Sequence, residues 1–404
     1  MFLWLGQVIS QFGDRLTQIA LIGLVYTKIG ADSLGLAKIL FFTILPVFLI
    51  NPLAGVYIDR WDKRKTMYAA DFLRGVLILV LGAFLIGIKS FIPIYVVIFL
   101  AFCVGRFFVP AKMSILPMLV KKDEIITANS LVSITANVAA ILGFGVGGII
   151  VESWGAKGGF IFDSMTFFSS SLLIMFITIK IRGRFDRHDL VELGKGVVDV
   201  ERSLIREFKE GIKYILSRQS TLFSVKIFSV LFSCLGALYV VFIVFVQQTL
   251  HTATKDLGFL AVWLGLGLFI GSLVYGRVAH KFSLVKSISL MLFLTCFFLT
   301  AFVLIIKNIP SPVLACFFSF ILGVLVSPIV VGCNSLIHKK SGDEFWGRIF
   351  SSLEVVMHFS FVVCMFLAAA LAEIFSPFKI ILVIGIIISV FSLGALLKGE
   401  KCLS

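Results

Sequence analysis

Charged and polar side chains inside long apolar stretches are the residues of this sequence that could do chemistry. A charge well inside a membrane-spanning helix costs about 2.5–3.5 kcal/mol on insertion scales, so such residues are candidates for binding ions, protons or substrate. Five places in the chain qualify. They are Gln11 with Asp14 and Arg15, Asp71 with Arg74, Arg106, Asp163, and Glu354 with His358.

Two of these places could bind a proton. Asp14 and Arg15 point about 100° apart on a helix, so we expect each to have its own partner. Asp14 is either a proton-coupling carboxylate or one half of a structural pair with another helix. Glu354 and His358 stand at i and i+4 on one helix face and could share a proton, although an intramembrane histidine can also be a satisfied core residue. The proton-coupling candidates are therefore Asp14, Glu354 and His358.

The other charges suit charge balance, gating or substrate binding. Asp71 and Arg74, at i and i+3, can pair on one helix face. Arg106 could balance Asp14 or bind an anionic group. Asp163 is expected within a turn or two of the end of its span, where it could reach the membrane surface or cap a helix. The candidates for substrate binding or charge balance are Gln11, Arg15, Arg106 and Asp163.

The elements that position these residues are long apolar helices. Hydrophobic residues make up 59% of the 404 residues and charged residues 14%, with a mean hydropathy of +1.09, which indicates an all-α polytopic membrane protein. Segments long enough to cross about 30 Å number twelve. They are 2–27, 34–58, 67–88, 92–119, 126–151, 159–181, 220–246, 257–279, 284–306, 312–337, 347–373 and 377–397.

An internal repeat predicts two bundles of six transmembrane helices. The segment 276–286 has the frame of the basic loop 55–65, and the Pro110 to Lys121 spacing recurs from Pro328 to Lys339. Both offsets are near 220 residues, as in a six-plus-six repeat. We expect an N-terminal bundle over 1–181, a cytoplasmic linker with an amphipathic helix over 182–219, and a C-terminal bundle over 220–404.

Charge and composition exclude several classes of protein. The net charge of +14 arises mostly from loops that share one side of the membrane, which places both termini in the cytoplasm by the positive-inside rule and disfavours nucleic acid as a partner. The seven cysteines have no metal-binding spacing, and no nucleophile-and-base pattern or phosphate loop is present, so we expect no metal, no cofactor and no enzyme. The N-terminus is predicted to be a retained span because no signal-peptide cleavage site follows it.

The loop between the second and third spans carries a motif. Gly55, Asp59, Arg60 and Arg64 resemble the G-x-L-x-D-R-x-G-R-R/K loop of the major facilitator superfamily, with Tyr57 and Asp62 at the usual Leu and Gly positions. The flanking residues 51–54 and 69–74 are similar to the branch with macrolide-efflux proteins and the enterobactin exporter. The resemblance implies an alternating-access transporter. The residues of its cytoplasmic gate would be Gly55, Asp59, Arg60, Arg64, Asp71 and Arg74.

Two further resemblances bear on the substrate. Gly143, Gly147 and Gly148 are similar to the glycine motif of the superfamily's antiporters, and glycines of this kind let helices pack closely. The stretch 110–116 also resembles bacterial lysophospholipid transporters. The family implies a monomer in the bacterial inner membrane that exports a hydrophobic or amphipathic molecule in exchange for protons. The alternative that these residues leave open is a lysophospholipid flippase, with the lipid bilayer as partner in both cases.

Overall fold

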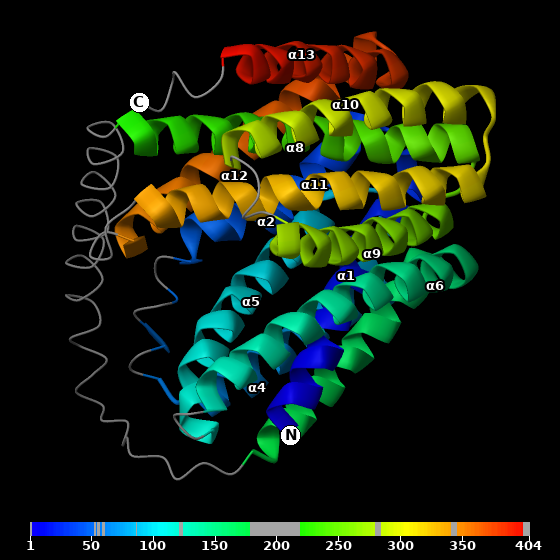
Figure 1. The fold of residues 1–404 in the computed structure, drawn as a ribbon. Coiled ribbons are helices and arrows are strands. Elements are labelled where there is room, and N and C mark those ends of the chain that lie inside the picture. Colours follow the sequence, from blue (N-terminus) through cyan, green and yellow to red (C-terminus); the bar gives the residue numbers. More distant parts are fainter. Residues whose placement is uncertain are drawn as a thin grey trace. The chain divides into compact units, whose positions relative to one another are not determined.

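The computed structural model describes residues 2–51, 54, 57–58, 61–85, 87–120, 124–177, 219–278, 284–340 and 346–398. Helices and the turns between them account for these residues, and no strand occurs among them (Figure 1). The helices are α1 (Phe2–Ile29), α2 (Ser33–Leu49), α4 (Lys63–Val80) with its π-helical continuation η1 (Leu81–Leu85), α5 (Ile92–Leu119), α6 (Ile125–Met175), α8 (Gln219–Leu250), α9 (Lys255–Val278), α10 (Leu284–Asn308), α11 (Pro312–Lys340), α12 (Trp346–Ile374) and α13 (Pro377–Lys398).

The helical ranges agree with the predicted spans, each of which overlaps one of these helices. Within the described residues, eight helical segments are long and apolar enough to cross a membrane. Helix α1 has 28 residues but is not among the eight, and α2 is a shorter apolar helix. The chain is therefore an all-helical membrane protein, and the full count of twelve spans stays a prediction.

Helix α6 contains two of the predicted spans, which meet at Gly155. This glycine has φ 69° and ψ 175°, a conformation that L side chains rarely adopt. Before Gly155, the contacts with α1 advance along both helices. Val132 is near the start, at Gln7, and Gly147 lies further along, at Ile19. After Gly155, the contacts move back along α1. Gly159 lies at Ala20, and Ser170 lies at Gly6. The two arms of α6 therefore lie antiparallel to each other, and both pack on α1.

The chain divides into two compact units. The first comprises Met1–Lys28 and Lys38–Arg206, and the second Ile29–Ala37 and Glu207–Ser404. Helices α4, α5 and α6 belong to the first unit and α8 to α13 to the second. The predicted amphipathic helix of the linker lies outside the described residues, and the domain boundaries of the sequence analysis stay a prediction.

Glycines bring helices α9 and α11 of the second unit into backbone contact. A Cβ atom at Gly267 would overlap with the carbonyl oxygen of Phe320, and one at Gly271 would lie 2.7 Å from the carbonyl oxygen of Val324. Beside them the hydroxyls of Ser272 and Ser327 lie 2.8 Å apart. In a bilayer, where lipid is as apolar as leucine, such close packing and interhelical hydrogen bonds are what hold helices together.

The Gly267→Ala substitution is expected to destabilise the second unit. The added methyl group has no room, so α9 and α11 must separate, at a cost of about 1–3 kcal/mol. Thermal unfolding of the purified protein in detergent measures the loss. Gly276→Ala in the same helix is the matched control, because nothing lies within 4 Å of its Cβ position. Equal unfolding midpoints for the two variants would contradict the packing described here.

Candidate functional site: a buried charge cluster in the first unit

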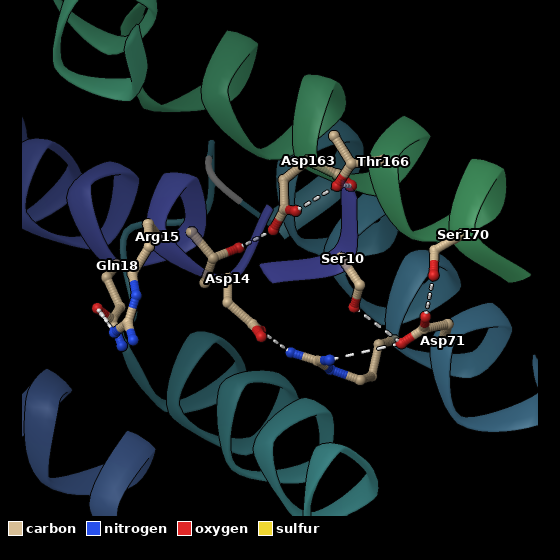
Figure 2. Close-up of polar contacts among 10 residues, drawn as sticks. Ser10, Asp14, Arg15, Gln18, Asp71, Asp163, Thr166 and Ser170 are labelled. Atoms are coloured by element: carbon tan, nitrogen blue, oxygen red, sulfur yellow. Dashed lines mark hydrogen bonds and ion pairs between the residues drawn. The ribbon is translucent and has the colours of Figure 1, made fainter. Parts of the chain in front are cut away.

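Arg74 of α4 is the centre of a charge cluster inside the first unit. Its guanidinium forms an ion pair with Asp14 of α1, and its Nη1 lies 3.6 Å from Asp71 Oδ1 on its own helix (Figure 2). The Asp71 side chain is completely buried, whereas that of Asp14 is 34% exposed. The predicted pairing of Asp71 with Arg74 is confirmed, and Asp14 is the more exposed of the two acids that face Arg74.

Asp71 is held by hydroxyl groups from two other helices. Ser10 of α1 donates to Oδ1 at 3.2 Å, and Ser170 of α6 donates to Oδ2 at 2.5 Å (Figure 2). Each carboxylate oxygen therefore has a donor in addition to the neighbouring guanidinium. A buried charge is tolerated where it is both paired and hydrogen-bonded, which is the arrangement found here.

The Arg74 side chain fits between α5 and α6. Its Cζ lies 4.1 Å from the centroid of the buried Phe167 ring, a cation–π contact. On its other side is Gly105 of α5, where a Cβ atom would lie 3.2 Å from Arg74 Nε. The glycine therefore leaves room for the Arg74 guanidinium.

Asp163 of α6 lies beside this cluster and is fully buried. Thr17 of α1 donates a hydrogen bond to its Oδ2, and Thr166 Oγ1 lies 3.0 Å from its Oδ1 (Figure 2). A Cβ atom on Gly13 of α1 would overlap with both Asp163 Oδ1 and Thr166 Oγ1. The expectation that Asp163 reaches the membrane surface or caps a helix is wrong, because the side chain points inward against the backbone of α1.

Arg15 points away from the cluster, as expected for a residue about 100° around the helix from Asp14. Its Nη1 donates to Gln18 Oε1 at 3.0 Å (Figure 2). Its guanidinium lies 5.6 Å from the centroid of the Phe144 ring. The prediction that Asp14 and Arg15 have separate partners is confirmed. The side-chain oxygen of Gln11, one turn earlier, is buried with no hydrogen-bond partner among the described residues.

The glycines of the first arm of α6 lie against α1. A Cβ atom at Gly143 would lie 2.8 Å from Arg15 Cβ, and one at Gly147 would lie 3.0 Å from Ile19 Cγ2. Gly148 follows on the same arm. From the gating motif, Arg64 Nη1 donates to the carbonyl oxygen of Ile177 at 2.6 Å. These contacts join α1, α4 and α6 around the charge cluster.

Several candidate residues are not brought into the cluster. The charge that balances Asp14 is on Arg74, whereas Arg106 lies half-buried in α5. Gly55, Asp59 and Arg60 lie outside the described residues. In the second unit, Glu354 belongs to α12 but its side chain is not described, and the His358 ring lies 6.5 Å from that of Phe232.

Sequence reasoning missed the hydroxyl groups and one lysine. Ser10 and Thr17 stand at −4 and +3 from Asp14, and Thr166 and Ser170 at +3 and +7 from Asp163, so helical periodicity could have placed each set on one face. Lys112 of α5 is only 6% exposed, is within electrostatic reach of Asp14, and makes no ion pair within 4 Å among the described residues. From the sequence alone, a lysine near a loop is expected at the surface, so the burial of Lys112 was found only from its neighbours in the structure. The missed hydroxyl-bearing residues are Ser10, Thr17, Thr166 and Ser170.

Comparison with known proteins agrees with this architecture. A family model described as "Transmembrane secretion effector" matches residues 1–327. The MFS-type transporter YkuC of Bacillus subtilis is 26% identical over 325 residues, covering 78% of this chain and 72% of YkuC. Macrolide efflux protein A of Streptococcus pyogenes is 23% identical over 385 residues, covering 92% of this chain and 88% of that protein.

A solved structure shares the fold. The structure of a POT family transporter in complex with 5-aminolevulinic acid superposes with a TM-score of 0.73 and 12% sequence identity, and the match covers 100% of this chain and 96% of that one. At this identity the likeness concerns the fold alone.

The Arg74→Gln substitution is expected to destabilise the protein by about 3–5 kcal/mol, because it leaves buried carboxylates without their counter-charge. Adding Asp71→Asn to the same chain is expected to restore part of the loss, since one of the two unpaired charges is then removed. Denaturant or thermal unfolding in detergent measures both effects.

Arg15→Gln is the matched control for Arg74→Gln. It removes an arginine from the same unit, but one whose guanidinium contacts Gln18 and Phe144 and forms no ion pair among the described residues, so a loss of about 1 kcal/mol or less is expected. If the two single variants were equally stable, Arg74 would not be the centre of the cluster.

Proposed function

Since the chain belongs to the transmembrane secretion effector family of the major facilitator superfamily and lies in its efflux branch, we propose that it is a proton-coupled exporter of amphipathic small molecules. It works by alternating access, with two bundles moving around a central site. Its proposed location is the cytoplasmic membrane of a bacterium, as a monomer with both termini in the cytoplasm.

The observation that carries the proposal is the partly exposed Asp14 in a buried ion cluster. Asp14 shares Arg74 with Asp71, so a proton that binds to Asp14 removes one of the two negative charges facing the guanidinium. The other two groups of the cluster are completely or nearly completely buried and are less able to exchange protons with water. Asp14 is therefore the proposed point at which a proton changes the contact between α1 and α4.

Such a proton drives transport only if it favours one of the two facing states over the other, because a ligand with equal affinity for both states shifts nothing. In the first unit, protonation of Asp14 weakens its ion pair with Arg74, and this change provides the difference in proton affinity between the two facing states. Glu354 and His358 of α12 are the proposed second proton site, on the second unit. The gating role of Asp59 and its neighbours, which the family motif implies, remains a prediction.

The amphipathic class of substrate is supported by the relationship to macrolide efflux protein A, which aligns with 92% of the chain. Long apolar helices that carry few charges suit a substrate that is itself largely apolar.

One observation favours the second candidate, a lysophospholipid transporter. Lys112 is a buried cation of the first unit without an ion-pair partner among the described residues. A phosphate group of a lipid could pair with it, since an ammonium is a strong point-charge partner for phosphate.

The Asp14→Asn substitution is expected to abolish proton-driven transport. In liposomes with an imposed pH gradient and an internal pH dye, a macrolide-like cation should cause proton flux with the wild-type protein. Flux with Asp14→Asn should fall to that of protein-free liposomes, because the group that exchanges the proton is gone. Glu354→Gln is tested in the same way.

Asp32→Asn is the matched control for this experiment. At the start of α2, Asp32 Oδ1 accepts a hydrogen bond from the backbone N–H of Leu34 and Oδ2 accepts one from that of Gly35, and the asparagine oxygen keeps one of these two bonds. Wild-type proton flux in both Asp14→Asn and Glu354→Gln would rule out the proposed coupling sites.

The lipid alternative is tested with Lys112→Gln and a lysophospholipid in place of the cation. If the protein carries lysophospholipid, translocation should fall in Lys112→Gln, because the phosphate loses its partner, and no proton signal should accompany it. Translocation of the lysolipid by the wild-type protein without proton flux would replace the exporter proposal by this one.

A further inference from the structure

The Asp163 carboxyl is buried beside the ion cluster but takes no part in it. It is 0% exposed, and its hydrogen-bond partners are the hydroxyl groups of Thr17 and Thr166. Among the described residues no lysine or arginine nitrogen lies within 4 Å of it. An ionised carboxylate in such a place lacks the paired cation that makes buried charge tolerable.

The hydrogen bonds around Asp163 indicate where a proton lies. Thr166 Oγ1 is 2.7 Å from the backbone carbonyl oxygen of Asp163 and 3.0 Å from its Oδ1. A hydroxyl group has one proton, and the carbonyl oxygen at the shorter distance can only accept it. The contact with Oδ1 is then made if the acid carries a proton and donates it to Thr166. Thr17 donates to the other oxygen, Oδ2, so a neutral acid satisfies every contact.

The charges of the surrounding helices lead to the same conclusion. Asp14 of α1 and Arg74 of α4 are the charged groups within electrostatic reach of Asp163. With the buried Asp71 of α4 and Lys112 of α5, the partly exposed Asp14 and the buried Arg74 make two negative and two positive charges. This set is balanced without a charge on Asp163, so ionisation of Asp163 would leave an excess negative charge in the bundle.

We propose that Asp163 is a proton-binding site of the first unit, which carries its proton on Oδ1 toward Thr166 while Asp14 and Asp71 remain ionised against Arg74. The site is closed by α1, because Gly13 and Thr17 lie directly on the carboxyl group. Release of the proton therefore requires α1 and the second arm of α6 to separate at Gly13. In so far as this proton is exchanged during transport, the inference rests on the proposed proton-coupled function.

Infrared spectroscopy of the full-length protein in lipid tests the proton directly. At neutral pH the wild-type protein should show the carbonyl stretch of a protonated carboxylic acid, which moves in D₂O and is lost in Asp163→Asn. Asp14→Asn and Asp71→Asn should retain the band. The band's absence from the wild-type protein, or its persistence at full wild-type intensity in Asp163→Asn, would overturn the proposal.

A second variant keeps the test valid if Asp163→Asn does not fold. Thr166→Val removes the acceptor of the proposed proton, so the band should move to the frequency of a less strongly hydrogen-bonded acid without disappearing. An unmoved band would contradict the assignment of the proton to the Asp163–Thr166 contact. Ser164→Ala is the matched control, since Ser164 is equally buried on α6 but donates to the carbonyl oxygen of Ile161.

A transport measurement separates this proposal from the proposed function. If the Asp163 proton is exchanged, substrate movement by Asp163→Asn should depend less steeply on pH, because one of the titrating acids is gone, whereas Ser164→Ala keeps the wild-type pH profile. An unchanged pH profile in Asp163→Asn would overturn the exchange of this proton. A wild-type protein that shows the infrared band but moves no protons would support the proton on Asp163 and overturn proton coupling.

Discussion

A guanidinium group shared by two carboxylates inside an apolar helix bundle is the interaction on which the first unit depends. Arg74 pairs with Asp71 on α4 and with Asp14 on α1, and hydroxyls from α1 and α6 complete the bonds of Asp71. In a low-dielectric interior a set of buried charges is stable only when each charge is paired. Helices α1, α4 and α6 must therefore keep the rotation and depth that bring these partners together. The cluster therefore fixes helix positions as well as balancing charge.

Small residues allow the helices to approach closely around this cluster. Gly13 lies under the Asp163 carboxyl, Gly105 lies beside the Arg74 guanidinium, and Gly143 brings the first arm of α6 onto α1 at Arg15. In lipid there is no hydrophobic driving force between helices, so close contact and interhelical hydrogen bonds must supply the attraction. The glycines and the charges of the first unit thus depend on each other.

The first unit also contains acids in two different environments. Asp14 and Asp71 face a cation, whereas Asp163, one turn further along α1, faces two threonine hydroxyls. Both environments meet on α1, which carries Ser10, Asp14 and Thr17 at helical spacing. In a transporter of this superfamily, a helix that contacts charges and a hydroxyl-bound acid through one face links any rotation of that helix to both sets of bonds.

The sequence by itself determined the helices, the membrane class, the family resemblance, the Asp71–Arg74 pair and the divergent directions of Asp14 and Arg15. These depend on residues close in the chain, whose relative positions follow from the helical period. Only the tertiary structure decided that Arg74 pairs with Asp14, that Asp163 is buried against Thr17, and that Lys112 lies inside. Contacts between helices depend on the rotation and depth at which each helix packs, and these are set by many side chains at once, including Gly13 and Gly105, which carry no charge to reveal them.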